Sequence, residues 1–202
     1  MYLIFYEMFF DDALTASKVL EITLTGRDCG QPERAPMCGV PYHACDVYLN
    51  KLIENGFKVA ICEQVEDPKL AKGIVKREVI RVVTPGTNMS NAILDETRNN
   101  YLMSIFENDG AFGISLVDIT TGEFKTARVP SLSKLTDEIN KYSPAEIIGN
   151  HSFMNCDLDF VYLREKMKIS ISEAPEHYFN QMLCEDAIMR QFGVNNMDGL
   201  GL

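Results

Sequence analysis

The chain has 202 residues, and its hydrophobic fraction of 46% and charged fraction of 24% are those of an ordinary globular protein. Its formal net charge of −10 argues against a nonspecific nucleic-acid binder, because phosphate contacts usually need a basic face. The sequence contains neither an apolar run long enough for a membrane span nor a recognisable signal peptide. We therefore predict a cytoplasmic protein with no membrane partner.

The first half predicts a small domain of mixed helices and strands. Apolar residues recur at helical spacing in two segments and alternate in a third, while Gly and Pro crowd the stretch between the two helices. The expected elements are a helix over 8–20, a loop over 28–41, a helix over 43–55, and strands over 57–65 and 76–84.

The second half predicts an α/β domain, because a hairpin pattern is followed by alternating helix and strand patterns. The polar segment 87–100 separates the halves, which gives domains over 1–88 and 99–202 joined by a linker over 89–98. The final segment shows no closing element, so we expect the second domain to be cut short at its C-terminal end. The expected elements are two strands within 111–129 joined at Thr121-Gly122, a helix over 132–142, strands over 145–149 and 168–172, and a helix over 179–187.

The cysteines predict free thiols and no metal. They lack the dense, regular spacing of a secreted disulfide scaffold. Cys29, Cys38, His43 and Cys45 are crowded, but their spacing matches no common zinc site.

Three acids of the second half leave an enzyme as an alternative. Asp118, Glu123 and Glu146 lie on or beside predicted strands, as the carboxylates of a two-metal nuclease would. Acids beside a tight turn more often face solvent or cap the turn, and we expect Asp118 to accept backbone N–H bonds there. No phosphate-binding loop motif occurs, so we predict no catalytic residue and no cofactor in this chain.

The triplet Phe5, Tyr6, Glu7 is the most informative local pattern. In a strand, Phe5 and Glu7 point to the same side, so an apolar ring and a carboxyl group could address one target together. A ring that can wedge between bases beside an acid that can hydrogen-bond a base edge is a device for probing nucleic acid. The alternative is a core Phe5 with a solvated Glu7.

A loop and a basic stretch add candidate contacts. Gly39 allows close approach of the backbone to a partner, Met37 and Pro41 offer a stiff apolar edge for a shallow groove, and His43 lies near an expected helix start that favours phosphate. The local basic residues are Lys69, Lys72, Lys76, Arg77 and Arg81.

Taken together, these segments resemble the MutS family of bacterial DNA mismatch-repair proteins. The resemblance rests on FYEMFFDDA, LTGRDCG, PMCGVPYHA, VAICEQVEDP, VKREVIRVVTPGT, SLVDITTGEF and the final FGV and GLG, which occur in the family's order and spacing over essentially the whole chain. It implies a small mixed-sheet mismatch-recognition domain followed by a ribonuclease H-like α/β connector domain that has no nuclease activity.

The resemblance also implies roles for single residues. Phe5 matches the ring that wedges in at a mispaired or unpaired base from the minor groove, and Glu7 matches the acid that hydrogen-bonds the displaced base. The matching groove and backbone contacts are Arg27, Met37, Gly39, Pro41 and His43, to which the basic stretch adds Lys76 and Arg77. The implied partners are mismatched double-stranded DNA and, through the connector, a MutL-like protein.

Two departures from the family pattern bear on these expectations. Met1-Tyr2-Leu3-Ile4 stands where the family has an Arg-x-Gly-Asp-like tetrapeptide preceded by more chain, so we expect a shortened strand before Phe5. The family's ATPase domain, with its ATP, Mg²⁺ and homodimer contacts, is expected to lie outside this chain. A protein-interaction module that does not bind DNA in isolation therefore stays open beside the mismatch reader and the nuclease.

Overall fold

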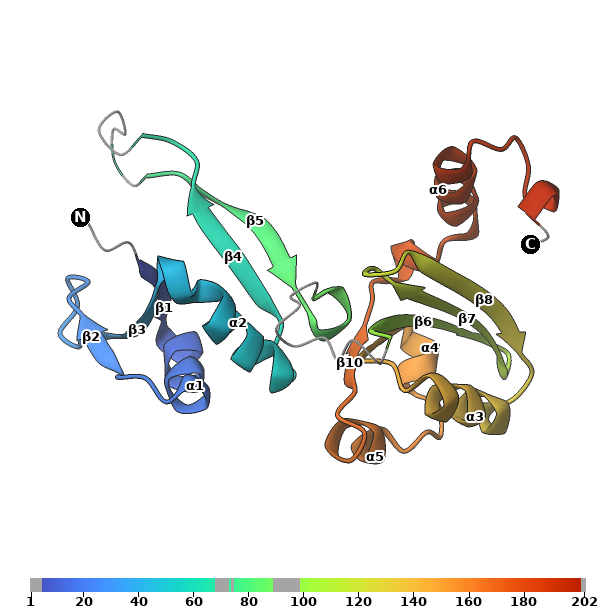
Figure 1. Ribbon diagram of the computed structural model, residues 1–202, viewed down its shortest axis with the longest axis horizontal. Helices are drawn as coiled ribbons and strands as arrows, with labels where there is room; N and C mark the ends of the chain where they lie inside the picture. The colour runs from blue at the N-terminus through green and yellow to red at the C-terminus, as the bar shows by residue number, and fades with distance from the viewer. Residues whose placement is uncertain (1–4, 68–72, 74, 89–98, 201–202) are drawn as a thin grey trace. The chain divides into compact units, whose positions relative to one another are not determined.

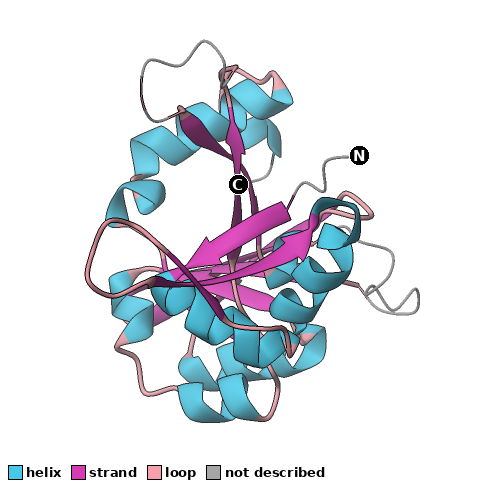
Figure 2. Cartoon of the chain, turned by 90° about the vertical axis from the view of Figure 1, so that its left-hand side faces the viewer, coloured by secondary structure: helices cyan, strands magenta, loops and turns pink. Residues whose placement is uncertain are grey.

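The computed structural model describes residues 5–67, 73, 75–88 and 99–200, and it divides into two compact units, Met1–Asn99 and Asn100–Leu202 (Figure 1). The chain combines helices with strands (Figure 2), and both units hold elements of each kind, so the predicted mixed α/β class is confirmed. The expected shortening before Phe5 and the expected linker over 89–98 lie outside the described residues. No helix within the described ranges is long and apolar enough to cross a membrane.

The first unit holds a three-stranded antiparallel sheet in the order β1-β3-β2 and a separate two-stranded hairpin of β4 and β5. Helix α1 covers one face of the larger sheet, where Ala13, Ala16 and Leu20 pack with Cys38 and Val40. The elements are β1 (Phe5–Phe9), α1 (Phe10–Leu20), β2 (Thr25–Arg27), β3 (Ala35–Pro41), η1 (Tyr42–Ala44), α2 (Cys45–Glu54), β4 (Val59–Gln64), β5 (Arg77–Val83) and η2 (Pro85–Thr87).

The loop predicted over 28–41 is wrong for its second half. Ala35–Pro41 forms β3, the central strand of the sheet, despite its two prolines and its glycine. Pairing on both sides and burial of Cys38 and Val40 under α1 outweigh the local preference of these residues for turns. Helix α1 begins at Phe10 rather than at residue 8, because Met8 and Phe9 extend β1.

The second unit is built on one five-stranded sheet in the order β10-β9-β6-β7-β8. Strands β6, β7 and β8 form an antiparallel meander, whereas β9 and β10 join parallel to β6 and β9. The elements are β6 (Tyr101–Asn108), β7 (Ala111–Asp118), β8 (Glu123–Val129), α3 (Leu132–Tyr142), β9 (Glu146–Gly149), α4 (His151–Met154), α5 (Phe160–Glu165), β10 (Ser170–Glu173), η3 (Glu176–Phe179), α6 (Gln181–Phe192) and η4 (Asp198–Leu200). A mixed sheet with helical crossovers agrees with the ribonuclease H-like architecture that the resemblance implies.

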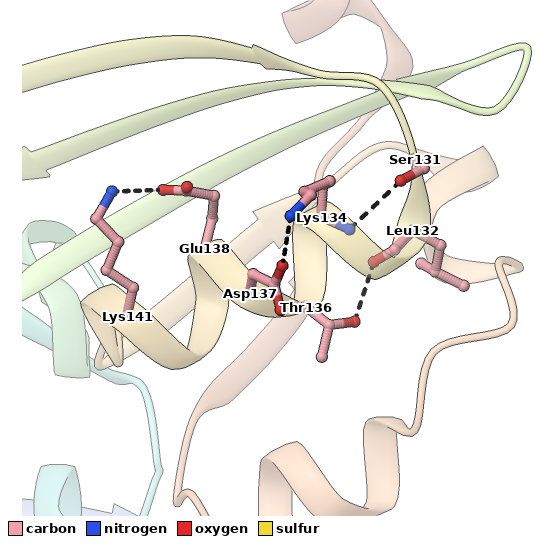
Figure 3. A network of polar contacts seen from close by, with 7 residues as sticks. All are labelled: Ser131, Leu132, Lys134, Thr136, Asp137, Glu138 and Lys141. Atoms are coloured by element: carbon pink, nitrogen blue, oxygen red, sulfur yellow. Dashed lines mark hydrogen bonds and ion pairs between the residues drawn. The ribbon is translucent and has the colours of Figure 1, made fainter.

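Helix α3 shows how the predicted 132–142 helix is stabilised (Figure 3). The Ser131 hydroxyl caps it by accepting a bond of 3.4 Å from the Lys134 amide, and Lys134 forms an ion pair of 3.1 Å with Asp137. Its opposite side buries Leu135 and Ile139 in the core of the unit. The helix therefore follows the amphipathic pattern of its sequence.

Strand β6 is the main element that sequence patterns missed in this unit. It is central, with Tyr101, Met103 and Ile105 buried and Leu102 only partly exposed on the other side. Apolar residues on both faces remove the alternation that marks a half-buried strand. Helices α4 and α5 were also missed, because four and six residues are too few to show a helical period.

Candidate nucleic-acid interface

Strand β1 presents two faces of different character. Tyr6 and Met8 point inward and pack against the cluster under α1, while Phe5, Glu7 and Phe9 alternate with them on the outer face. The Phe5 side chain is 47% exposed, so it is not a core residue. The expectation that Phe5 and Glu7 share one side of a strand agrees with this geometry.

The pairing of β1 with β3 brings further candidates to the same face. Phe5 lies opposite Pro41, Glu7 opposite Gly39, and Phe9 opposite Met37. Paired residues of an antiparallel ladder project to the same side. The outer face of the β1-β3-β2 sheet therefore carries Phe5, Glu7, Met37, Gly39 and Pro41 together.

Gly39 leaves space in the middle of this outer face. A Cβ atom there would lie 3.8 Å from Phe5 Cδ1, 3.9 Å from Glu7 Cγ and 3.2 Å from the Tyr6 carbonyl oxygen. Without it, the ring of Phe5 and the carboxylate of Glu7 border a strip of bare backbone. A flat ligand can approach the sheet most closely at this strip.

Arg27 adds a cation to the outer face from the neighbouring strand β2. Its Nη1 atom donates to Glu7 Oε2 at 2.7 Å, and its guanidinium carbon lies 5.9 Å from the centre of the Phe9 ring. The ion pair is partly open to solvent, with side-chain exposures of 57% for Arg27 and 38% for Glu7. Both groups therefore stay accessible to a ligand.

The remaining predicted contacts lie elsewhere in the first unit. His43 is exposed in the three-residue turn η1, and α2 begins only at Cys45, so His43 does not open that helix as expected. Lys76 and Arg77 lie at the start of β5, in the hairpin, where Lys76 Nζ forms an ion pair of 2.6 Å with Glu78. None of these three residues lies on a strand of the β1-β3-β2 sheet. Lys69 and Lys72 lie outside the described residues.

Sequence patterns missed Tyr6, which anchors β1 from the inner face of the sheet. The Tyr6 hydroxyl donates to the carboxylate of Glu63 on β4, and the Tyr6 ring stacks on Tyr42 with centres 5.4 Å apart. The hydrogen bond to Glu63, reinforced by burial, raises the pKa of Tyr6 well above its ordinary value. Strand alternation could have placed Tyr6 opposite Phe5 and Glu7, but nothing local could have identified a partner 57 residues away.

The acids considered for a nuclease do not converge. Asp118 pairs with Glu123 across β7 and β8, so these two acids share a face of the sheet. Glu146 pairs with Leu102, which points to the opposite face because its neighbour Tyr101 is the partner of Asp118. Asp118 Oδ1 accepts from the Thr120 amide at 2.9 Å, and its Oδ2 accepts from the Asn100 amide at 3.1 Å. No group of three or more His, Cys, Asp or Glu side chains in the described ranges could hold a metal ion.

Asp118 serves the turn, as expected from the sequence. Burial raises the pKa of its carboxyl group, but hydrogen bonds from the Thr120 hydroxyl and from backbone amides outweigh burial and set the pKa below the ordinary value. The four residues whose crowding was considered for zinc differ in exposure, because Cys38 is buried under α1 while Cys29 and His43 are exposed.

Comparison with known proteins decides the family. The family model described as MutS domain I matches residues 4–92, and the model of MutS domain II matches residues 100–202. The chain belongs to the MutS family. Residues 4–92 therefore correspond to the family's first domain, and all residues of the outer face lie within that match.

Three similar proteins carry the name DNA mismatch repair protein MutS. The relative from Lachnoclostridium phytofermentans is 58% identical over 198 residues, which are 98% of this chain and 21% of that protein. Those from Acetivibrio thermocellus and Alkaliphilus oremlandii are 54% and 47% identical over 88% and 98% of this chain, respectively. The chain spans about a fifth of the length of the curated relatives that it matches, 21% for the first of them.

Proposed function

We propose that the outer face of the β1-β3-β2 sheet reads mispaired or unpaired bases in double-stranded DNA from the minor groove. The observation that carries this proposal is the arrangement of Phe5 and Glu7 on one face of β1, beside the bare backbone of Gly39 on β3. An exposed ring next to an exposed carboxylate fits a device that must unstack one base and hydrogen-bond it. MutS family membership supports the same conclusion.

Phe5 acts as the wedge in this proposal. Inserting a ring between base pairs costs a few kcal/mol of unstacking per step, and a mispaired step is already weakened, so kinking is cheaper there. An exposed Phe5 can enter the duplex without leaving a cavity in the protein core. Selectivity then arises from the deformability of the DNA rather than from its sequence.

Glu7 reads the displaced base. An ionised carboxylate accepts a hydrogen bond from thymine N–H, whereas a protonated one donates to a purine ring nitrogen. Arg27 Nη1 lies 2.7 Å from this carboxylate and holds it on the outer face. Met37, Pro41 and His43 contact the groove and backbone around the site, while Lys76 and Arg77 contact phosphates from the hairpin.

The second unit is the connector in this proposal. It relays the reading of the mismatch to the ATPase region of a longer homodimeric protein and to a MutL-like partner, and it binds no cofactor itself. The protein works on DNA in the bacterial cytoplasm. The 202 residues alone bind DNA poorly, since a net charge of −10 limits the release of counterions.

The test uses a full-length chimera, in which these residues replace the matching segment of the Lachnoclostridium phytofermentans relative. Phe5→Ala should remove the preference for mismatched over matched duplex, measured by fluorescence anisotropy at fixed salt. Phe124→Ala is the matched control, because that ring is 56% exposed on the second unit. Preserved mismatch preference in Phe5→Ala would contradict the proposal.

Two further titrations separate the alternatives. Tight, salt-resistant binding of matched duplex by the isolated 202 residues would contradict the predicted weak binding. Calorimetry with Mn²⁺ tests the nuclease: saturable binding that disappears in Asp118→Asn would replace the connector with a metal enzyme. Both measurements need only this chain.

A further inference from the structure

Tyr6 occupies a special place between the two proposed reading residues. It follows Phe5 and precedes Glu7 in β1, yet it projects to the opposite face of the sheet. We infer that Tyr6 is a positioning residue for mismatch reading, which holds β1 in place through its hydrogen bond to Glu63 and its stacking on Tyr42. This inference rests on the proposed function of the outer face.

Three contacts from three elements fix Tyr6. Its hydroxyl donates to Glu63 on β4, and its ring stacks on Tyr42 of η1 with centres 5.4 Å apart and planes inclined by 27°. Its backbone pairs with Val40 in the β1–β3 ladder. Contacts from a strand, a turn and a distant hairpin leave Tyr6 few alternative orientations.

The bond between Tyr6 and Glu63 belongs to a strong class of hydrogen bond. Its acceptor is a carboxylate and its site is partly buried, and bonds to charged groups contribute more than neutral ones. The raised pKa of Tyr6, caused first by this bond and then by burial, keeps the phenol protonated as a donor.

Strand β1 needs such an anchor because it is an edge strand. Among the strands that the structure describes, the sheet order β1-β3-β2 gives it a hydrogen-bonded neighbour on one side only. Because side chains alternate along a strand, a twist or slip at Tyr6 displaces Phe5 and Glu7 together. A displacement of about 1 Å in a group that must meet a ligand in a fixed geometry is enough to weaken its interaction with that ligand strongly.

The same contact ties the outer face to the β4–β5 hairpin. Glu63 lies opposite Glu78 in the β4–β5 ladder, and Glu78 forms the ion pair with Lys76. Lys76 is a proposed phosphate contact. The hydrogen bond from Tyr6 thus fixes the distance between the residues that read the base and those that hold the backbone.

The test introduces Tyr6→Phe into the full-length chimera. This change removes the hydroxyl and keeps the ring, so the ratio of mismatched to matched duplex affinity should fall about tenfold, while matched-duplex affinity stays unchanged. Glu63→Ala should have the same effect, and Glu63→Gln, which keeps an accepting oxygen, should restore most of the ratio. Tyr101→Phe is the matched control, since it removes a hydroxyl that donates to a carboxylate, that of Glu123, in the second unit.

A second measurement does not depend on DNA. In the isolated 202 residues, hydrogen exchange of the β1 amides should accelerate about tenfold in Tyr6→Phe, with no change at β6 in the other unit. Unchanged exchange at β1 overturns the inference. So does an unchanged affinity ratio in a chimera whose Phe5→Ala variant has lost mismatch preference. If Phe5→Ala keeps that preference, the proposed function fails, and hydrogen exchange still decides whether Tyr6 positions β1.

Discussion

Two phenylalanines show how differently the two units use their sheets. Phe5 on β1 is 47% exposed beside a strip of bare backbone, whereas Phe153, just after β9, has an exposure of 0% and meets the Phe160 ring edge-on at 5.4 Å. The first unit leaves one sheet face open to a ligand, while the second fills its core with large side chains. Mutations of the same kind should therefore act on binding in one unit and on stability in the other.

The largest difference is expected for truncation of these two rings. Phe153→Ala should lower the free energy of unfolding by about 3–5 kcal/mol, because it opens a cavity in the core of the second unit. Phe5→Ala should change it by less than about 1 kcal/mol, since no cavity forms. Urea unfolding of both variants checks this, and comparable losses would mean that Phe5 supports the fold.

Adding a methyl group at two glycines sharpens the comparison. A Cβ at Gly149 would lie 2.2 Å from Phe153 Cδ1 in a filled core, so Gly149→Ala should cost about 3 kcal/mol. A Cβ at Gly39 would lie 3.2 Å from the Tyr6 carbonyl oxygen and at ordinary contact distances of 3.8 Å and 3.9 Å from Phe5 Cδ1 and Glu7 Cγ. Gly39→Ala should cost less than about 1 kcal/mol while weakening mismatch preference, because it covers the bare backbone beside Phe5 and Glu7. Equal melting temperatures for the two variants would count against this reading.

The buried acid Asp118 extends the comparison to charge. Asp118→Asn should cost about 1–2 kcal/mol at pH 7, because the amide cannot accept all the hydrogen bonds that the buried carboxylate accepts. The pKa of Asp118 is lower in the folded protein than in the unfolded chain, so this stabilisation is complete above about pH 4. It is lost as the pH falls through the folded-state pKa. Urea unfolding from pH 7 to pH 3 should show the free energies of unfolding of the unchanged chain and of Asp118→Asn converging. A constant difference between them would contradict the lowered pKa of Asp118.

The smallest effect is expected at the exposed ion pair. Arg27→Gln removes the partner of Glu7, but both side chains are open to solvent, so the loss should stay below about 1 kcal/mol and shrink further in high salt. Thermal unfolding at two salt concentrations measures it. A loss of stability that salt does not reduce would indicate that Arg27 stabilises the fold by packing rather than by its ion pair with Glu7.

Local patterns predicted the elements that bury one face in a core and expose the other face to solvent. Helix α3 and the β7–β8 hairpin around Thr121-Gly122 are examples, as is the shared side of Phe5 and Glu7. Strand β3 could not be predicted, because its partners β1 and β2 overrule the turn preference of its own residues. The same limit applies to the candidate site: Met37, Gly39 and Pro41 reach the outer face only through the register of β3 with β1.

Tyr6 and Glu63 illustrate the remaining gap. Their hydrogen bond joins residues far apart in the chain, and no spacing rule connects them. Lys76 and Arg77 were grouped with the site on charge alone, yet the structure places them in the hairpin. Charge and residue type identify chemistry, whereas only tertiary contacts decide which groups act together.

The strand order of the second unit also has a consequence for how this unit folds. Strands β6, β7 and β8 are neighbours in the chain and pair through short turns, whereas β9 and β10 reach the sheet only after helical connections. Closing a hairpin takes microseconds, and pairing distant segments is slower because a longer loop must be ordered first. We expect the meander to form in the folding transition state and β9 to dock afterwards, so that Ile114→Val slows folding while Ile147→Val mainly speeds unfolding.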